Sequence, residues 1–251
     1  EDVDSGRPSL VQCCAMPALS SLRESFLTQP KRDTSWQWIF MANVFFGCIS
    51  FSIVMPNLYL YLHSMHVSKA FYACVVASFS VGEALGAIAI GSLSNHVGTK
   101  RSLKLCSVLG MSGASSYALA RFVYNGISHD AAPFVALGGR LVQGIAAGGR
   151  QAVEQAYISV AAPPEQITEL TGMLSTFACL GFIFGPAFGA AVGAIRPFDL
   201  GPIEFNNFTL AGWLCAALDA LILINLSVFF REAPTTARGG GDAERGGDAT
   251  P

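Results

Sequence analysis

Six long apolar stretches dominate this chain of 251 residues. A helix that crosses a bilayer needs about 20 mostly apolar residues, and each of the six is long enough. Charged residues make up only 13% of the sequence, about half of the ~25% that is usual in soluble proteins. The sequence therefore predicts an all-α membrane protein with six transmembrane helices. The expected spans are residues 39–62, 70–94, 105–124, 131–162, 170–195 and 205–230.

The two ends of the chain are polar. Residues 1–35 are expected to form a cytoplasmic tail, residues 36–232 a six-helix bundle, and residues 233–251 a flexible, glycine-rich cytoplasmic linker. Ten basic residues lie on one side of the expected spans and three on the other, which favours both termini in the cytoplasm. With this orientation Asn207, in an Asn-Phe-Thr sequon on the far side, is a glycosylation candidate.

Charge and cysteine spacing exclude several partners. The net charge of −2 gives no bulk attraction for nucleic acid. The seven cysteines show no spacing typical of metal ligands, so we expect no metal site and no cofactor. The expected partners are the lipid bilayer and a small-molecule substrate.

Two of the expected spans carry polar residues along one face. On a helical wheel of about 100° per residue, each polar group falls within an arc of roughly 100° or less. The group in residues 39–62 comprises Asn43, Gly47, Ser50, Asn57 and Tyr61. The group in residues 131–162 comprises Arg140, Gln143, Arg150, Gln151 and Glu154. Because charged side chains in a membrane usually face a bundle interior or a watery cavity, these stripes indicate a cavity wall; the alternative is a hydrogen-bonded seam between helices.

Five ionisable residues lie well inside the expected spans. Arg150 can pair with Glu154, one helical turn away. Its guanidinium can instead hold an anionic substrate, or serve as a permanent structural partner of Glu154 or Glu83. Buried carboxylates can carry protons, and Glu83 is our candidate for proton coupling. Asp219 has no polar companion on its own face, so we expect it to form a structural bond to another helix.

Three segments match a known family in order. The turn from Gly91 to Arg101 reads GSLSNHVGTKR and resembles the signature loop of the major facilitator superfamily, G-x-L-x-D-x-x-G-x-[RK]-[RK]. Residues 140–149 resemble its fourth-helix pattern, R-x-x-Q-G-x-x-x-G-G, and residues 181–189 its fifth-helix pattern, G-x-x-x-G-P-x-x-G. The chain is identified as a member of that superfamily over roughly residues 36–232.

The resemblance implies a fold and a mechanism. Members have two six-helix halves, each built from a 3+3 inverted repeat, and work by alternating access. This chain corresponds to the N-terminal half, so we expect the C-terminal six-helix half to be missing from it and to lie on the same chain or on a partner. The implied function is secondary active transport of a small solute, coupled to protons or another ion. The residues expected to bind substrate are Arg150, Glu154, Asn43, Asn57, Arg140 and Gln143.

The resemblance also implies a gate and a location. The expected gate and hinge residues are Gly91, Asn95, Gly98, Lys100, Arg101, Gly181, Gly185, Pro186 and Gly189. Asn95 stands where the family has an Asp, which removes the usual cytoplasmic charge pair. Several stretches are similar to a subgroup that contains the lysosomal major facilitator domain-containing protein 8 and the SPX-linked vacuolar transporters. An endolysosomal or vacuolar membrane is therefore expected rather than the plasma membrane.

An enzyme is the first rival interpretation. Residues 110–113 read Gly-Met-Ser-Gly, which resembles the GxSG motif of rhomboid intramembrane proteases. That chemistry needs a histidine on a later span to activate the serine. The histidines at 63, 66, 96 and 129 all lie in expected loops and none follows residue 141, so we predict that the chain is not an enzyme. A channel or a non-transporting scaffold of the same fold is the other alternative.

Overall fold

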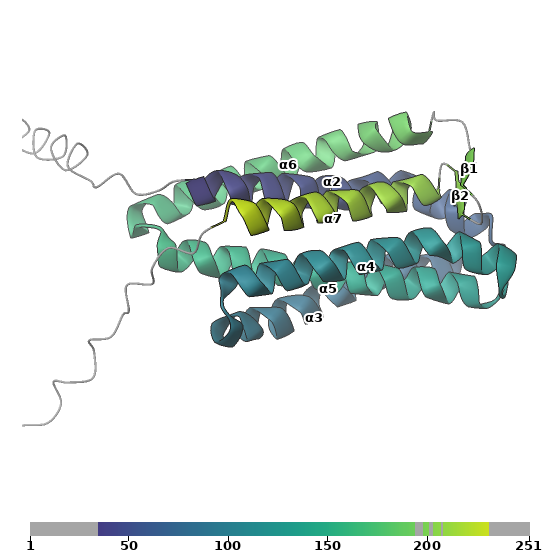
Figure 1. Cartoon of the computed structure of the whole chain (residues 1–251), viewed down its shortest axis with the longest axis horizontal. Helices are drawn as coiled ribbons and strands as arrows, with labels where there is room; N and C mark the ends of the chain where they lie inside the picture. The colour runs from purple at the N-terminus through teal and green to yellow at the C-terminus, as the bar shows by residue number, and fades with distance from the viewer. Residues whose placement is uncertain (1–34, 194–197, 201–202, 207, 231–251) are drawn as a thin grey trace, which may run out of the picture. The chain divides into compact units, whose positions relative to one another are not determined.

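The computed structural model describes residues 35–193, 198–200, 203–206 and 208–230 of the chain. Within these residues it contains six α-helices and one antiparallel pair of short strands (Figure 1). The helices are α2 (Ser35–His63), α3 (Lys69–Val97), α4 (Thr99–Gly126), α5 (Ala131–Ala161), α6 (Pro164–Gly193) and α7 (Thr209–Val228). Strand β1 (Phe198–Leu200) pairs with β2 (Ile203–Phe205) between α6 and α7.

Each expected span corresponds to one helix, which confirms the all-α fold class. Four helices, α2, α3, α6 and α7, are long and apolar enough by composition to cross a membrane. Helices α4 and α5 are as long, with 28 and 31 residues. Helix α5 turns its charged residues inward, because the side chains of Arg140 and Glu154 are each only 1% exposed.

Several helix starts differ from the expected ones: α4 begins at Thr99 rather than at 105, and α6 at Pro164 rather than at 170. The sixth span was expected to begin at residue 205, but Phe205 belongs to β2 and α7 begins at Thr209. The side-chain oxygen of Asn206 accepts hydrogen bonds from the backbone N–H groups of Phe208 (3.1 Å) and Thr209 (3.0 Å). This bonding satisfies backbone donors that a helix leaves free at its first turn, so the helix starts there. The expected tail, apart from Ser35, the expected linker and Asn207, the acceptor of the sequon, lie outside the described residues.

Glycine residues let α3 and α5 pack almost backbone to backbone. In Figure 1, α3, α4 and α5 lie together on one side of the bundle, and α2, α6 and α7 on the other. A Cβ atom added at any of four glycines would come closer than 3.0 Å to backbone atoms of the opposite helix. These glycines are Gly82 and Gly86 of α3, and Gly144 and Gly148 of α5. We call this contact the glycine seam, since small residues are what allow membrane helices to approach so closely.

The glycines of the fifth-helix pattern pack against α2. A Cβ atom at Gly181 would lie 2.7 Å from the backbone oxygen of Phe45, and one at Gly189 would lie 3.0 Å from that of Ile53. The hydroxyl of Ser52, which faces Gly185, lies 3.3 Å from the backbone oxygen of Gly181. The close packing expected for this stripe is therefore present, while its role as a hinge stays a prediction.

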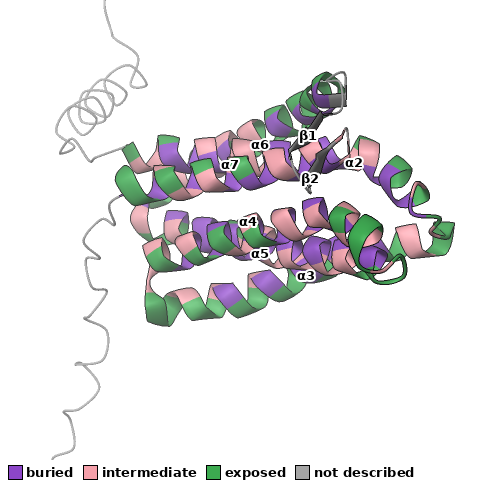
Figure 2. Ribbon diagram, turned by 45° about the vertical axis from the view of Figure 1, so that its right-hand side comes forward, coloured by how far each residue is buried: buried purple, intermediate pink, exposed green. Residues whose placement is uncertain are grey.

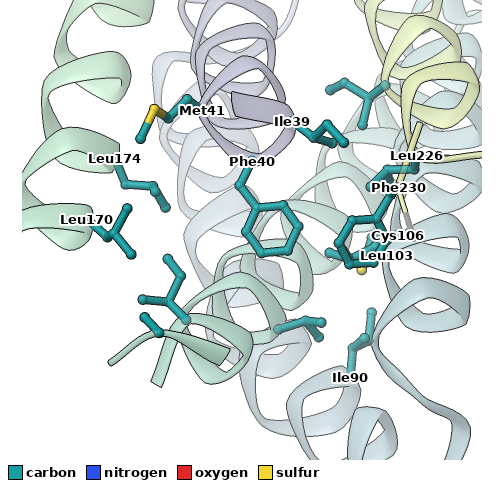
Figure 3. Close-up of a cluster of buried hydrophobic side chains, with 14 residues drawn as sticks. Ile39, Phe40, Met41, Ile90, Leu103, Cys106, Leu170, Leu174, Leu226 and Phe230 are labelled. Carbon is teal, nitrogen blue, oxygen red and sulfur yellow. The ribbon is translucent and has the colours of Figure 1, made fainter. Parts of the chain in front are cut away.

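Two apolar clusters occupy the two ends of the bundle. The Phe40 cluster joins all six helices and is drawn in Figure 3, where the ring of Phe40 lies among side chains from the other helices. Its members are Ile39, Phe40, Met41, Ile90, Leu103, Cys106, Val153, Ile158, Ala162, Leu170, Leu174, Ile222, Leu226 and Phe230. The Tyr61 cluster at the other end includes Val54, Leu58, Tyr61, Leu62, Val75, Ala114, Tyr117, Ala132, Ala136 and Cys215. Along their helices, Asn43 and Ser50 of α2 and Arg140, Gln143 and Arg150 of α5 lie between the two clusters.

The outer faces of α3 and α6 are exposed, as Figure 2 shows, and they carry large apolar side chains. Helix α3 exposes Val81, Leu85 and Ile88, and helix α6 exposes Ile183 and Phe188. Large apolar side chains pointing outward are unfavourable in water but are what a lipid-facing helix presents. Burial thus supports the membrane assignment independently of composition.

Candidate functional site

A cavity of about 260 Å³ lies between the two apolar clusters. Its walls come mainly from the polar faces of α2 and α5, with two residues from α3, one each from α4 and α7, and four from α6. The polar lining residues are Asn43, Ser50, Glu83, Arg140, Gln143, Arg150, Gln151, Glu154, Gln155, Ser175 and Asp219. Both predicted polar stripes therefore contribute to one cavity in the middle of the bundle.

Arg150 is bound to Asp219 across the bundle. Its Nη2 donates to Oδ1 of Asp219 at 2.7 Å, and both side chains are buried. Among the described residues Arg150 forms no ion pair with Glu154 or Glu83, the two partners that the sequence suggested. Asp219 thus forms the interhelical bond that was expected of it, and it links α7 to α5.

Arg140 has no carboxylate partner in the part of the chain that is described. Its Nη1 donates to Oε1 of Gln143 at 3.1 Å, and its guanidinium lies 4.7 Å from the ring centre of Phe79 and 5.7 Å from that of Phe51. The side chain is 1% exposed, and neither Nε nor Nη2 has a hydrogen-bond partner in the protein. Cation–π contacts stabilise the charge in part, but half of the guanidinium fork has no acceptor.

The buried polar atoms around the cavity that lack a partner are mostly donors. They are Asn43 Nδ2, Arg140 Nε and Nη2, Arg150 Nε and Nη1, and Glu154 Oε1. Buried polar groups are normally hydrogen-bonded, and those of a transmembrane bundle that lack protein partners generally face water or a ligand. With five donor atoms and one acceptor, the cavity suits a ligand that supplies oxygen acceptors.

Five of the six predicted substrate-binding residues line this cavity, and Asn57 does not. Asn57 is half-buried on α2 between Val54 and Leu58, at the level of the Tyr61 cluster. A helical wheel shows which face of a helix a residue lies on but not its position along the helix axis. For this reason Asn57 was expected at the cavity although it lies beyond it. Farther along the stripe the hydroxyl of Tyr61 donates to the backbone oxygen of Tyr117 at 3.2 Å. At this depth the alternative of a hydrogen-bonded seam is therefore the better description of α2.

Three residues that contact Arg140 or Asn43 were not identified from the sequence. Phe51 and Phe79 face Arg140, and their identity as apolar residues gave no signal of that contact. Asn225 lies within α7, where its Nδ2 donates to Oδ1 of Asn43 at 3.1 Å. A polar amide within a span is uncommon, so the sequence alone could have singled out Asn225. The sequence cannot show which helix that amide contacts.

The signature loop is almost entirely helical. Helix α3 runs to Val97 and α4 starts at Thr99, so Gly98 alone connects them, with φ of 93°. That value lies in the region that favours glycine. Asn95 and Arg101 are exposed, and the ammonium group of Lys100 donates to the backbone oxygens of Phe230 and of Ser227, the latter at 3.4 Å. Lys100 thus binds carbonyl groups at the C-terminal end of α7, where a cation is favourable.

The protease-like motif does not form a nucleophile. Ser112 is exposed on α4, and its hydroxyl donates to the backbone oxygen of Leu109 in its own helix at 2.8 Å. The described histidines all lie at or beyond helix ends. The geometry gives no support to serine hydrolysis at this residue.

Comparison with known proteins agrees with the arrangement. A family model described as Major Facilitator Superfamily matches residues 34–249. The major facilitator superfamily domain-containing protein 8 of Xenopus laevis is 27% identical over 241 residues, which are 92% of this chain and 45% of that protein. An SPX domain-containing membrane protein of Arabidopsis thaliana is 29% identical over 192 residues, which are 76% of this chain and 26% of that protein.

Solved structures share the fold. A D-xylose-proton symporter superposes with a TM-score of 0.63 at 17% identity, over 81% of this chain and 49% of that one. An inward-open xylose transporter from E. coli gives 0.60 at 19% identity, over 77% and 47%. This chain spans half or less of the length of the proteins compared here. The family model, the relatives and the six-helix fold lead to one conclusion, that the chain belongs to the major facilitator superfamily.

Proposed function

We propose that this chain is one six-helix half of an alternating-access carrier and that its cavity binds a small anionic solute. The observation that carries the proposal is Arg140, a buried guanidinium that lines the cavity without a carboxylate partner among the described residues. An uncompensated charge in a transmembrane bundle is costly and usually marks a substrate or ion pathway. A transported anion would supply the missing charge.

The free atoms of Arg140 are well placed for an oxyanion. Nε and Nη2 lie on one edge of the planar guanidinium, and this edge binds two oxygens of a carboxylate or phosphate in parallel. Gln143 bonds Nη1, at the other side of the fork, and so fixes the orientation of the plane. Asn43 adds a further free donor to the same cavity. The charge of Arg150, by contrast, is neutralised by Asp219, and this ion pair links α5 to α7.

The coupling and gating roles belong to the same proposal. Glu83 lines the cavity half-buried on α3, where a carboxyl group can exchange protons with a watery interior. Glu154 lines it as well, with one oxygen free of any partner in the protein. The proposed cytoplasmic gate is formed by Gly98, which connects α3 to α4, and by Lys100 of α4, which contacts the end of α7. One relative structure is titled a proton symporter, which makes proton coupling the natural choice of ion.

A second half completes the proposed carrier. The chain covers 45% of its Xenopus relative and 49% of the symporter structure, so the opposing wall of the cavity has to come from the remainder. We propose that this half lies on the same chain or on a partner, in an endolysosomal or vacuolar membrane with both termini cytoplasmic. The similarity to lysosomal and vacuolar members supports that location.

Anion binding can be measured on the purified protein in detergent by thermal unfolding. Inorganic phosphate, sulfate and chloride are titrated, with glucose as a neutral probe. A ligand at ten times its Kd stabilises the folded state by about 1.4 kcal/mol. Wild type should be stabilised by at least one of the anions and not by glucose, and Arg140→Gln should lose this effect. Arg101→Gln removes the same charge from an exposed site and should retain it, which corrects for non-specific salt effects.

The two-half proposal is tested separately in liposomes. This chain alone should bind the anion without transporting it, whereas the carrier with both halves should show saturable uptake and counterflow. Saturable uptake by the chain alone would contradict the requirement for a second half. Flux that is unsaturable and lacks counterflow would indicate a channel instead. Equal anion stabilisation of wild type and Arg140→Gln would overturn the assigned site.

A further inference from the structure

Gly110 of α4 lies against the carboxylate of Asp219. A Cβ atom added at Gly110 would lie 2.7 Å from Oδ2, 2.9 Å from Oδ1 and 2.9 Å from Cγ of that residue. Atoms do not approach so closely, so any side chain at position 110 would have to displace the carboxylate. Gly110 therefore provides the space in which Asp219 meets Arg150.

A second glycine borders the same ion pair from α2. A Cβ atom at Gly47 would lie 3.3 Å from Nη1 of Arg150, a contact that a small shift relieves. The pair thus lies in a slot between Gly110 and Gly47, with the tighter side at Gly110. The clash at Gly110 involves the end of a side chain, whereas Gly113, one turn away, faces backbone atoms of α5 at 2.7 Å and 2.8 Å. Filling Gly110 should therefore move Asp219 rather than the helices.

We propose that Gly110 is a positioning residue that holds Asp219 on Arg150, and that Asp219 is an internal counterion that keeps Arg150 from binding the transported anion. This inference rests on the proposed function, since it assigns the two arginines of the cavity to different tasks. Arg140, which has no carboxylate partner among the described residues, binds the anion. The charge of Arg150 is instead balanced by Asp219, which bonds Nη2 and leaves Nε and Nη1 without a partner. Glu154 forms neither an ion pair nor a hydrogen bond with Arg150, so Asp219 is the carboxylate bonded to that guanidinium among the described residues.

The proposal predicts an unusual gain of binding. Displacing Asp219 leaves Arg150 with its whole fork free in the cavity that Arg140 also lines, about 15 Å away along α5. The variant then presents two cationic anchors in one cavity instead of one. Gly110→Ala should therefore bind phosphate several-fold more tightly than wild type. A substitution that merely disturbs packing would lower stability and leave the phosphate Kd unchanged or higher.

The test compares thermal unfolding of wild type, Gly110→Ala, Asp219→Asn and the double variant, each with and without inorganic phosphate. Asp219→Asn removes the counterion without adding volume, so it covers the case in which Gly110→Ala does not fold. Both single variants should be less stable than wild type without phosphate, and both should bind phosphate several-fold more tightly. The double variant should add little to either effect, because both changes break the same pair. Gly126→Ala, on the same helix with no atom within 4 Å of the added Cβ, is the control and should resemble wild type.

Three results would overturn the inference. The first is an unchanged or weaker phosphate Kd in Asp219→Asn or in a folded Gly110→Ala. The second is full additivity of the two substitutions in the absence of phosphate. The third is a change in Gly126→Ala as large as that in Gly110→Ala. If no variant binds phosphate, sulfate or chloride at all, the proposed function fails together with the counterion role, and the coupling of Gly110 to Asp219 is then decided by the phosphate-free data alone.

Discussion

Helix α5 presents two faces of opposite character. Toward α3 it forms the glycine seam, where Gly144 and Gly148 place backbone against backbone. Toward α2 and α7 it presents Arg140, Arg150 and Glu154 to a cavity in which several donor atoms have no partner in the protein. The same helix is therefore held rigidly from behind while its front carries the polar groups.

This difference between the two faces of α5 shows how a six-helix bundle can contain a charged cavity and still pack tightly. In the seam, an added Cβ atom meets backbone, which cannot move without separating the helices. At the cavity, the atoms next to Gly47 and Gly110 are the ends of polar side chains, which can rotate. Substitutions at the seam should thus affect stability alone, and those at the cavity should affect binding as well.

Removing the counterion on the cavity side should have the largest effect on stability. Asp219→Ala leaves Arg150 as a buried charge without its partner, and breaking such a pair costs about 3–5 kcal/mol. The loss can be measured as a lower Tm in detergent. Phosphate should restore part of it by binding the freed guanidinium. Wild-type stability in Asp219→Ala would contradict an important role for the pair.

The second largest loss of stability is expected for a substitution in the glycine seam. Gly148→Ala places a Cβ atom against the backbone of Glu83, and overpacking of this kind costs about 1–3 kcal/mol. The measurements are the Tm and the yield of monodisperse protein. Gly138→Ala, on the same helix with nothing within 4 Å of the added atom, is the matched control. Equal stability of the two variants would show that the seam is looser than described.

The hydrogen bond between the amides of Asn225 in α7 and Asn43 in α2 should contribute less to stability. Asn225→Ala removes the 3.1 Å hydrogen bond to Asn43 and should lower the free energy of unfolding by about 1 kcal/mol. Asn95→Ala at the exposed end of α3 should change it very little. If both changes have the same effect, this hydrogen bond does not stabilise the cavity wall.

The smallest effect is expected at the contact of α2 with α6. The hydroxyl of Ser52 donates to the backbone oxygen of Cys48 at 2.8 Å and lies 3.3 Å from that of Gly181. Hydrogen bonds between membrane helices average about 0.6 kcal/mol, so Ser52→Ala should cost about that much. Ser112→Ala, which loses only a bond within its own helix, serves as the reference. If Ser52→Ala lowers the stability as much as Gly148→Ala does, the contact of α2 with α6 is as important for the bundle as the glycine seam.

The helices and the polar faces were predictable from the sequence because they follow from local periodicity. The family motifs also supplied the order and role of the helices, including the participation of Arg140 and Gln143 in the cavity. The hairpin of β1 and β2 was missed because two strands of three residues each, between two apolar spans, leave almost no periodic signal.

The partners of the polar residues were not predictable. The sequence suggested Glu154 or Glu83 as the partner of Arg150. In the structure the partner is Asp219, which is 69 residues away in the chain. A helical wheel records the direction of a side chain but neither its depth nor the helix opposite, so Asn57 was assigned to the cavity although it lies at the Tyr61 cluster. Long-range packing determines which donors remain free, and the candidate anion site consists of those donors.

The polar face of α5 should border water and bind an anion. This expectation can be tested by thiol labelling in a variant without native cysteines, since Cys48 itself lines the cavity. Ala147→Cys lies on the cavity wall, and Ala146→Cys, at the next residue, is 1% exposed and away from it. We predict that a polar methanethiosulfonate labels Ala147→Cys and not Ala146→Cys, and that the anion which stabilises the protein slows this labelling. Failure to label Ala147→Cys, or equal labelling of both variants, would contradict the account.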